Sequence, residues 1–306
     1  MRRTCLDGVY ELAKSDPRVV FVGSDLGPGV LSDMQAEIPD RFYMEGVAEA
    51  NIIGVAAGLA MEGFIPYVNT IATFLTRRCY EQVALDLCLH NLPVRLIGNG
   101  GGVVYAPLGP THLAVEDIAI FRTLPNMTIV APVDKEEMGR FVPKTLDMPG
   151  PVYIRLARGG DPIVSDSNDE FVTGKAIEMR PVAHVTFIST GIMTNRALEA
   201  AETLDKEGIK CGVVHMHTLK PIDQDMILKA AAGSKLIVSL EEHTRIGGLG
   251  SAVAEILMDH APTHMPQLIR MGLPDAFATD YGRQDSLIAT MGLSMDDILK
   301  TVRDAV

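Results

Sequence analysis

One glutamate in this sequence lies in an apolar stretch, where a charged side chain is costly to bury. The stretch "EGVAEANIIGVAAGLAMEGF" (45–64) is apolar or small at almost every position from Val47 to Met61, which predicts a buried helix, yet Glu49 lies near its start. A glutamate in the first turn stabilises a helix through the macrodipole, and this effect needs no chemistry. A buried carboxylate without a partner, however, costs several kcal/mol or takes up a proton. Since small residues surround Glu49, the sequence indicates a ligand or a partner group for it.

A second set of reactive or aromatic side chains lies in "TIATFLTRRCYEQVALDL" (70–87). Phe74, Arg77 or Arg78, and Tyr80 or Glu81 are three or four residues apart, so they share faces of an expected helix. One interpretation is a set of core aromatics in an amphipathic helix. The other is an aromatic wall for a planar ring, because flat apolar ligands are held by stacking.

A glycine-rich stretch, "GNGGGVVYAPLGPTHLAVED" (98–117), follows the expected strand at 94–98. Ligands bind beyond the carboxyl ends of strands in open α/β sheets, so this loop is well placed for a site. Its glycines (100–102) lack the GxxxxGK[ST] pattern, and no helix begins directly after them, so the signal for a phosphate loop is weak. His112 could line the same site or could be a capping or solvent-exposed histidine.

Three further patterns carry less chemistry. Arg155 and Arg158 alternate off the end of the expected strand at 152–157; one of them could bind an anion, and a surface ion pair is the alternative. The histidines of "HMH" (215–217) have no third ligand nearby, and we predict no metal site there. The turn in "IGGLGSAVAEIL" (246–257) matches GxGxxG poorly and is more typical of helix packing than of dinucleotide binding.

Short apolar runs alternate with longer helical patterns along the chain, and this alternation predicts parallel sheets covered by helices on both faces. The expected strands are 19–23, 64–68, 94–98, 127–132 and 152–157, then 184–190, 212–219, 235–241 and 267–273. The expected helices are 71–90, 133–147, 193–207, 222–232, 249–260 and 295–304. We therefore predict an α/β fold with two three-layer α/β/α domains, the second being the smaller.

A stretch rich in Gly, Asp and Ser, "RGGDPIVSDSNDEFVTGK" (158–175), separates the two series and shows little periodicity. Such composition is typical of a connection between domains. We expect a first domain over 1–165, a linker over 166–180 and a second domain over 181–306.

The composition excludes several classes of partner. A net charge of −12 has the wrong sign for a surface that must neutralise many phosphates, so we expect no nucleic acid partner. No segment reaches the roughly 18 uncharged apolar residues of a membrane span. The four cysteines form no CxxC pair and lie in apolar settings typical of reduced thiols, which predicts a cytoplasmic location.

Taken together, these patterns resemble a known family. "GVAEANIIGVAAGLAMEGFIPYVNTIATFLTRRCYEQV", "LPVRLIGNGGG", "GPTHLAVEDIAIFRTLPNMTIVAPVD" and "VYIRLARG" are similar to the second half of transketolases and of deoxyxylulose-phosphate synthase. That half consists of the domain that binds the aminopyrimidine of thiamine diphosphate and of the C-terminal domain. The resemblance runs from the N-terminus to about residue 300.

The resemblance implies a partner for Glu49. In this family the matching glutamate bonds the N1′ nitrogen of the aminopyrimidine and so tunes the base that activates the thiazolium, while the cofactor acts as the electron sink. The same matching gives Phe74 and Tyr80 as walls of the pyrimidine pocket, and Arg77 at a position where the deoxyxylulose-phosphate type has arginine.

The resemblance also implies substrate contacts. Asp25 in "VGSDLGPG" matches an aspartate near the cofactor and the substrate channel. His112 matches the active-site histidine of GPTH, expected near the substrate hydroxyls, and Arg158 matches the arginine that holds a sugar phosphate.

A missing motif implies a partner protein. Family members of full length carry a GDG motif followed by asparagine, which binds magnesium and the diphosphate, and this chain has no GDG. We therefore expect a two-component transketolase in which a separate N-terminal subunit with the GDG and asparagine motif supplies the Mg2+ ligands. The expected assembly is α2β2, with cofactor sites at subunit interfaces.

Departures from the family pattern bear on the substrate. Gly100 replaces a histidine, Leu108 replaces an acidic residue before GPTH, and Gly29 replaces a phosphate-binding serine. Arg158, with Arg2 or Arg3, remains for an anion, so we expect a donor or acceptor sugar with a modified phosphate or hydroxyl pattern.

Three other functions stay open from the sequence. They are a synthase of the deoxyxylulose-phosphate type, the β subunit of a 2-oxoacid dehydrogenase, and a degenerate subunit that only assembles or regulates. Carbon dioxide release from pyruvate, as opposed to ketol transfer from a ketose, separates the first two from a transketolase.

Overall fold

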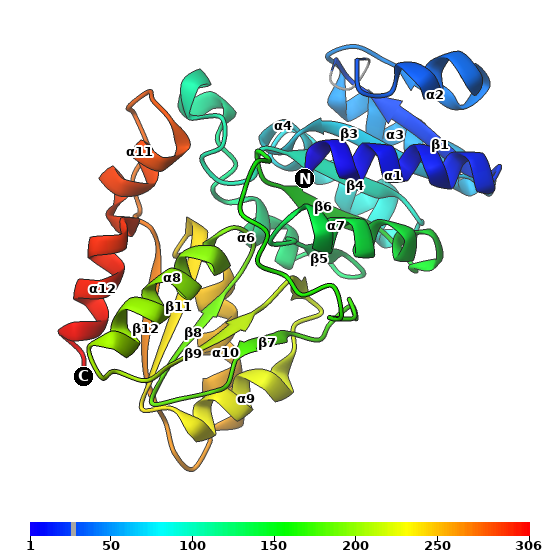
Figure 1. The fold of residues 1–306 in the computed structure, drawn as a ribbon. Helices are drawn as coiled ribbons and strands as arrows, with labels where there is room; N and C mark the ends of the chain where they lie inside the picture. The colour runs from blue at the N-terminus through cyan, green and yellow to red at the C-terminus, as the bar shows by residue number, and fades with distance from the viewer. Residues whose placement is uncertain (26–28) are drawn as a thin grey trace.

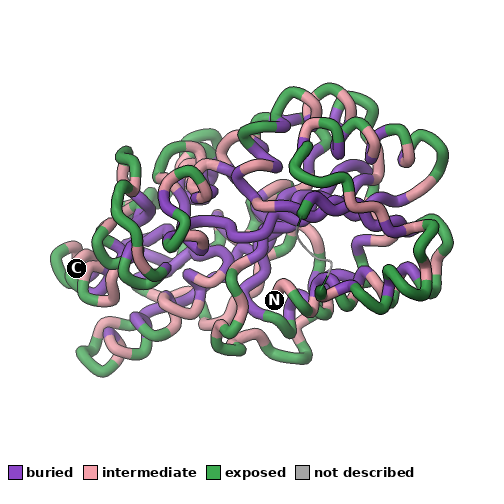
Figure 2. The backbone as a smooth tube through the Cα atoms, turned by 90° about the horizontal axis from the view of Figure 1, so that it is seen from above, coloured by how far each residue is buried: buried purple, intermediate pink, exposed green. Residues whose placement is uncertain are grey.

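The structure is a computed structural model that describes residues 1–25 and 29–306. It contains two β-sheets with helices packed against them, and the N-terminal and C-terminal sheets lie side by side in Figure 1. Buried residues follow the strands through the middle of the molecule, and exposed residues follow the outer helices and turns (Figure 2). The predicted α/β fold with two domains is confirmed. Among the described residues, no helix is long and apolar enough to cross a membrane.

The larger sheet has seven strands in the order β10-β5-β6-β4-β3-β1-β2, and all of its pairs are parallel except β10 with β5. Six of its strands are β1 (Val19–Gly23), β2 (Phe42–Met44), β3 (Ile65–Ile71), β4 (Arg95–Asn99), β5 (Thr128–Val130) and β6 (Val152–Leu156). The α-helices of this part are α1 (Arg2–Ser15), α2 (Ser32–Glu37), α3 (Glu49–Met61), α4 (Ala72–Thr76), α5 (Tyr80–Gln82), α6 (Asp117–Arg122) and α7 (Lys135–Phe141). Short 3-10 helices occupy Pro39–Arg41, Ala106–Leu108, Pro110–His112 and Val142–Asp147.

The smaller sheet has five strands in the order β12-β11-β8-β9-β7, of which only the edge strand β7 is antiparallel to its neighbour. The strands are β7 (Ile177–Arg180), β8 (Val185–Ser189), β9 (Cys211–His215), β11 (Leu236–Thr244) and β12 (Gln267–Leu273). Its helices are α8 (Met193–Lys206), α9 (Gln224–Gly233), α10 (Leu249–His260), α11 (Gln284–Ile288) and α12 (Met295–Arg303), with a π-helical stretch at Ala289–Leu293.

One predicted strand is wrong in a way that matters for the architecture. The expected strand 212–219 divides into β9 and β10 (Thr218–Lys220), and β10 pairs with β5 of the larger sheet. The C-terminal part of the chain therefore contributes an edge strand to the N-terminal sheet. The other expected strands are confirmed to within a few residues, whereas the short edge strands β2 and β7 were not predicted.

The connection between the sheets is partly as expected. The described residues 157–176 form no helix or strand, but residues 177–180 of the expected linker form β7. Phe171 of this segment is buried, and its ring packs on Phe141 and on His217, with centroid distances of 4.7 and 3.9 Å. The domain limits at 165 and 181 stay a prediction.

The expected continuous helix 71–90 is wrong. It consists of α4, a turn at residues 77–79, the one-turn α5 and a π-helical stretch at Val83–Leu89. π-helical turns are rare in proteins as a whole, and many of those known lie at functional sites. Because the helix is interrupted at the turn, Arg77 and Arg78 can extend to different partners.

Helix α3 is apolar around most of its circumference and begins at Glu49, close to the start of the expected helix. Its buried face includes Ile52, Ile53 and Ala56. On its other side, a Cβ atom added to Gly54 or Gly58 would meet no atom within 4 Å. The helix therefore packs on the sheet with one face and leaves an apolar, small-residue face open.

Candidate active site

Glu49 is the first residue of α3, and its side chain is only 2% exposed. Arg78 Nη1 donates a hydrogen bond of 2.6 Å to Glu49 Oε2. Glu49 Oε1 has no hydrogen-bond partner within the part of the chain that the structure describes. The buried carboxylate thus has a counter-ion on one oxygen and an unused acceptor on the other.

Three of the expected site residues lie next to one another. Phe74 is in α4, directly after β3, and its ring meets the ring of His112 edge-on with centroids 5.2 Å apart. The Arg78 guanidinium lies over the same Phe74 ring, 4.4 Å from its centroid. Since Arg78 also bonds Glu49, contacts run without a break from Glu49 through Arg78 and Phe74 to His112.

Arg77 lies apart from Glu49. Its Nε is 2.9 Å from Glu116 Oε1, and its Nη2 donates to the carbonyl oxygen of Leu113. Burial raises the pKa of Glu116, and the charge of Arg77 opposes that rise. Arg77 therefore ties the turn after α4 to the segment that follows His112, and the residue that contacts Glu49 is Arg78. The sequence pattern allowed either arginine, and the family resemblance favoured Arg77, whose place in the cofactor pocket stays a prediction.

Tyr80 and Asp25 lie at other edges of the region. The Tyr80 hydroxyl is 2.8 Å from Thr123 Oγ1, and the side chain is partly exposed. Asp25 is exposed at the carboxyl end of β1 and accepts a hydrogen bond from the Ser24 hydroxyl. The roles expected for Tyr80 and Asp25 at the cofactor stay predictions. Gly29 lies beside residues 26–28, which are outside the described residues.

The glycine-rich loop is built for close packing. The N–H groups of Gly100 and Gly101 both donate to the carbonyl oxygen of Leu156. Gly100 has φ +77°, and a Cβ atom there would meet the Tyr105 ring at 2.2 Å. These two N–H groups are therefore bonded within the protein and are not free to bind a phosphate.

The two candidate arginines after β6 have different surroundings. Arg155 is buried and bonds Asp117 through Nε at 2.7 Å. Although burial disfavours its charge, the contact with Asp117 raises the Arg155 pKa. Arg158 is exposed and lines two adjoining cavities of about 480 and about 720 Å3. The anion-binding alternative therefore fits Arg158, and Arg155 is part of the buried structure.

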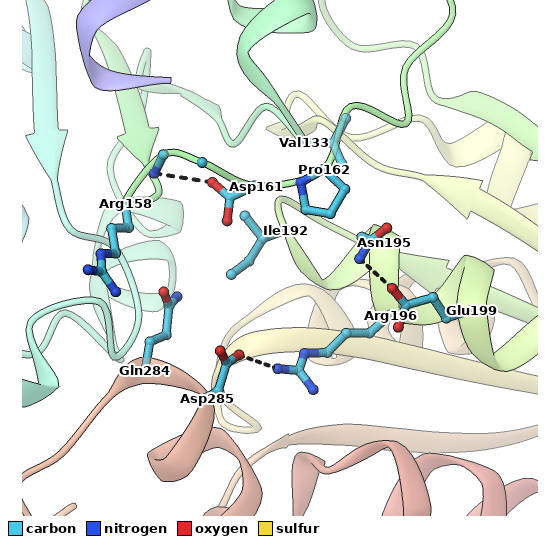
Figure 3. Close-up of a pocket in the computed structure, with 12 residues that line it drawn as sticks. Val133, Arg158, Asp161, Pro162, Ile192, Asn195, Arg196, Glu199, Gln284 and Asp285 are labelled. Carbon is cyan, nitrogen blue, oxygen red and sulfur yellow. Dashed lines mark hydrogen bonds and ion pairs between the residues drawn. The ribbon is translucent and has the colours of Figure 1, made fainter.

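Figure 3 shows the smaller of these cavities, into which Arg158 and Gln284 extend from opposite sides. Its other charged side chains are bonded within the protein: Arg196 to Asp285 at 2.7 Å, Glu199 to Asn195 at 2.9 Å, and Asp161 to the N–H of Gly159 at 3.1 Å. Arg158 has no hydrogen bond or ion pair within the described residues. It is therefore available to an anionic ligand.

The histidines of "HMH" have structural partners. His215 Nε2 is 3.0 Å from Glu137 Oε2, and its Nδ1 is 2.8 Å from Thr194 Oγ1. Burial lowers the His217 pKa to about 4, so this ring is neutral at physiological pH. Among residues 1–25 and 29–306, no group of three or more His, Cys, Asp or Glu side chains could hold a metal ion.

The turn at 246–250 also serves the fold. The N–H groups of Leu249 and Gly250, at the start of α10, donate to the two carboxylate oxygens of Glu241. Burial raises the pKa of Glu241 to about 7. This turn therefore binds a glutamate of the neighbouring strand.

Two family models cover most of the chain. The pyrimidine-binding domain of transketolase matches residues 1–160, and the C-terminal domain of transketolase matches residues 174–298. The chain is 38% identical to the 6-deoxy-6-sulfo-D-fructose transketolase subunit SqwH of Clostridium sp. (strain MSTE9), over 99% of this chain and 94% of that protein. It is 37% identical to one of the subunits of the apulose-4-phosphate transketolase of Phocaeicola vulgatus, over 100% of this chain and 97% of that protein.

A solved structure described as a split gene transketolase, inactive beta4 tetramer, is 36% identical and has a TM-score of 0.89. The match covers 99% of this chain and 97% of that chain. These relatives span almost the same length as this chain, and the predicted resemblance is confirmed. The chain therefore belongs to the transketolase family and corresponds along its whole length to relatives that are transketolase subunits.

Proposed function

We propose that this chain is the pyrimidine-binding subunit of a two-component transketolase that moves a two-carbon ketol unit from a ketose to an aldehyde. The observation that carries the proposal is Glu49, a buried carboxylate with one oxygen bonded to Arg78 and the other unused. Phe74 packs against the guanidinium of Arg78, and His112 packs against Phe74. A planar ring with an N–H group would complete this site.

The residues around Glu49 fit the aminopyrimidine of thiamine diphosphate. When bound, this cofactor supplies the carbanion that carries the two-carbon unit. Glu49 Oε1 would accept a hydrogen bond from the ring nitrogen, and a bond to an ionised acceptor is stronger than one to a neutral acceptor. Phe74 would pack against the ring, and His112, at its edge, would face the polar groups of the sugar.

The diphosphate end requires a second protein. The chain has no GDG motif, and the two relatives are named as subunits. We expect the partner subunit to supply the Mg2+ ligands in a cytoplasmic α2β2 assembly. The open face of α3, with Gly54, Gly58 and the exposed Met61, supports an interface beside Glu49. This chain would then bind one end of the cofactor and its partner the other.

The substrate is expected to be an anionic sugar. Arg158 and Arg283 both line the larger cavity, together with Tyr105 and Leu108. Burial raises the pKa of Tyr105, and Arg2 lies close enough for its charge to oppose that rise. The two relatives are named for sugars that carry a sulfo group and a phosphate. Arg158→Met should therefore raise KM for an anionic sugar much more than for its uncharged analogue.

The decisive test is Glu49→Gln in the enzyme reconstituted with its partner subunit. Loss of a group that acts on a proton in the transition state costs about 10²- to 10⁴-fold in rate, and we expect a fall in kcat of that order. Glu202→Gln, on the exposed side of α8, is the matched control and should leave kcat unchanged.

Two results would contradict the proposal. Unchanged ketol transfer by the Glu49→Gln enzyme would remove its chemical role and leave an assembly subunit. Carbon dioxide release from pyruvate by the wild-type pair, without ketol transfer from any ketose, would instead indicate a decarboxylating enzyme.

A further inference from the structure

Arg78 contacts Glu49 directly, yet the family resemblance gives it no role. It lies in the turn between α4 and α5, and its side chain is 47% exposed. The guanidinium is held on two sides, by Glu49 Oε2 at 2.6 Å and by the face of Phe74 at 4.4 Å from the ring centroid. A carboxylate contact and a cation–π contact together fix its position.

The other charged and titratable groups nearby do not compensate Glu49. Arg77 is engaged by Glu116 at 2.9 Å. Cys79 interacts electrostatically with Glu49, but burial raises its pKa to about 12, so the thiol is neutral. The His112 ring contacts the ring of Phe74. Arg78 is thus the cation in direct contact with this carboxylate.

The geometry of this contact leaves one carboxylate oxygen of Glu49 free to accept a hydrogen bond. Arg78 bonds only Oε2, so Oε1 keeps both of its lone pairs for a ligand. A hydrogen bond between two charged groups is shorter and stronger than one between neutral groups, so this contact fixes the orientation of the Glu49 carboxylate.

We infer that Arg78 is a positioning residue that holds Oε2 of Glu49 and so directs its free oxygen, Oε1, toward the ring nitrogen of the cofactor. This inference rests on the proposed function for what Glu49 binds. The pairing itself belongs to the chain alone, so it can be tested without the partner subunit. Arg78 then acts on catalysis through Glu49 and makes no contact with the reacting atoms.

The first experiment follows the carboxyl carbon of Glu49 by 13C NMR in the full chain, with the signal assigned by its loss in Glu49→Gln. In Arg78→Met the chemical shift of this signal, measured at one fixed pH, should change because the guanidinium that contacts Oε2 is gone. Arg78→Lys should restore part of the difference. Arg77→Met, which removes an equal charge one residue away, should leave the signal of Glu49 at its wild-type position.

The second experiment measures thiamine diphosphate binding by the reconstituted enzyme at one fixed pH. A Glu49 carboxylate that is no longer positioned loses its hydrogen bond to the cofactor ring. A bond to a charged group contributes about 1.5–3 kcal/mol, so binding by the Arg78→Met enzyme should weaken by about 10-fold or more.

An unmoved Glu49 signal in Arg78→Met overturns the inference, and so do equal shifts in Arg78→Met and Arg77→Met, which would indicate long-range charge and no specific contact. Arg78→Gln, a polar replacement, serves if the methionine variant does not fold. The proposed function is judged separately: a wild-type pair that fails to bind thiamine diphosphate would refute it, whatever the NMR signal of Glu49 shows.

Discussion

Two arginine–carboxylate pairs in this molecule have nearly the same bond length and opposite surroundings. Arg78 meets Glu49 at 2.6 Å, and Arg155 meets Asp117 at 2.7 Å. The Arg78 side chain is 47% exposed, whereas the Arg155 side chain is 7% exposed. The first pair uses one carboxylate oxygen, and the second uses both, since Arg155 Nη2 also reaches Asp117 Oδ1 at 3.2 Å.

The second pair is closed by further bonds. Tyr153 donates to Asp117 Oδ2 at 2.7 Å, and Arg155 Nη2 donates to the carbonyl oxygens of Ala114 and of Glu242. Glu242 is in β11, so this cluster joins the two sheets. Both oxygens of Asp117 are bonded and the pair is buried, whereas the Glu49 pair keeps one oxygen free. The contrast separates a charge pair that holds the fold from one that can do chemistry.

The largest effect on stability is expected from Arg155→Met. Removal of one partner from a buried pair leaves an uncompensated charge and costs about 3–5 kcal/mol in the free energy of unfolding. Urea denaturation of the full chain measures this cost. Arg303→Met breaks the exposed pair with Glu207 and should cost less than about 1 kcal/mol. Equal losses in the two variants would show that burial does not separate the pairs.

A smaller, pH-dependent effect is expected at Glu242, whose carboxylate accepts the N–H of Val103 and both contacts from Gln284 Nε2. Burial raises the pKa of Glu242 from 4.5 to about 7, and Arg155 opposes that rise. The folded protein therefore holds this proton more tightly than the unfolded chain. The contribution of Glu242 to stability falls as the pH rises from about 4.5 to about 7, by up to about 3 kcal/mol.

Glu242→Gln removes this titration. The free energy of unfolding of the variant, minus that of the wild type, should be larger at pH 8 than at pH 5 by about 1–3 kcal/mol, which means that the variant gains stability relative to the wild type. The difference between proteins is needed because buried His243, with its pKa lowered to about 4, makes the wild type respond to pH in the opposite sense below about 6.5. Glu202→Gln should show a constant difference, and a constant difference for Glu242→Gln would mean that Glu242 titrates alike in both states.

The parts of the fold that were predictable are those set by local pattern. The continuous apolar run at 19–23 predicted β1 at its observed limits, because a strand buried on both faces needs apolar side chains at every position. The burial of Glu49 followed in the same way from the apolar helix around it. The strand 212–219 failed because its division depends on whether β5 has a free edge for β10, and no local pattern carries that information.

The same limit explains what was missed at the site. Arg77 and Arg78 point to different sides even in a regular helix, and the sequence does not show which of them faces Glu116 and which faces Glu49. Helical periodicity cannot reveal an interruption of the helix that tertiary packing imposes. The cluster around Arg155 was also missed, since it joins this arginine to Glu242, 87 positions later in the chain.

The smallest expected effects come from one hydroxyl in each region. Tyr153→Phe removes the hydrogen bond to Asp117 Oδ2 inside the closed cluster and should cost about 1–3 kcal/mol, because a buried charged acceptor loses a donor. Tyr80→Phe removes the bond to Thr123 at the partly exposed edge, where water can replace it, and should change stability by less than about 0.5 kcal/mol. Thermal and urea unfolding of both variants measure the difference. If the two substitutions cost the same, the region around Asp117 is as accessible to water as the candidate active site, and the distinction between the closed and the open pair would have to be abandoned.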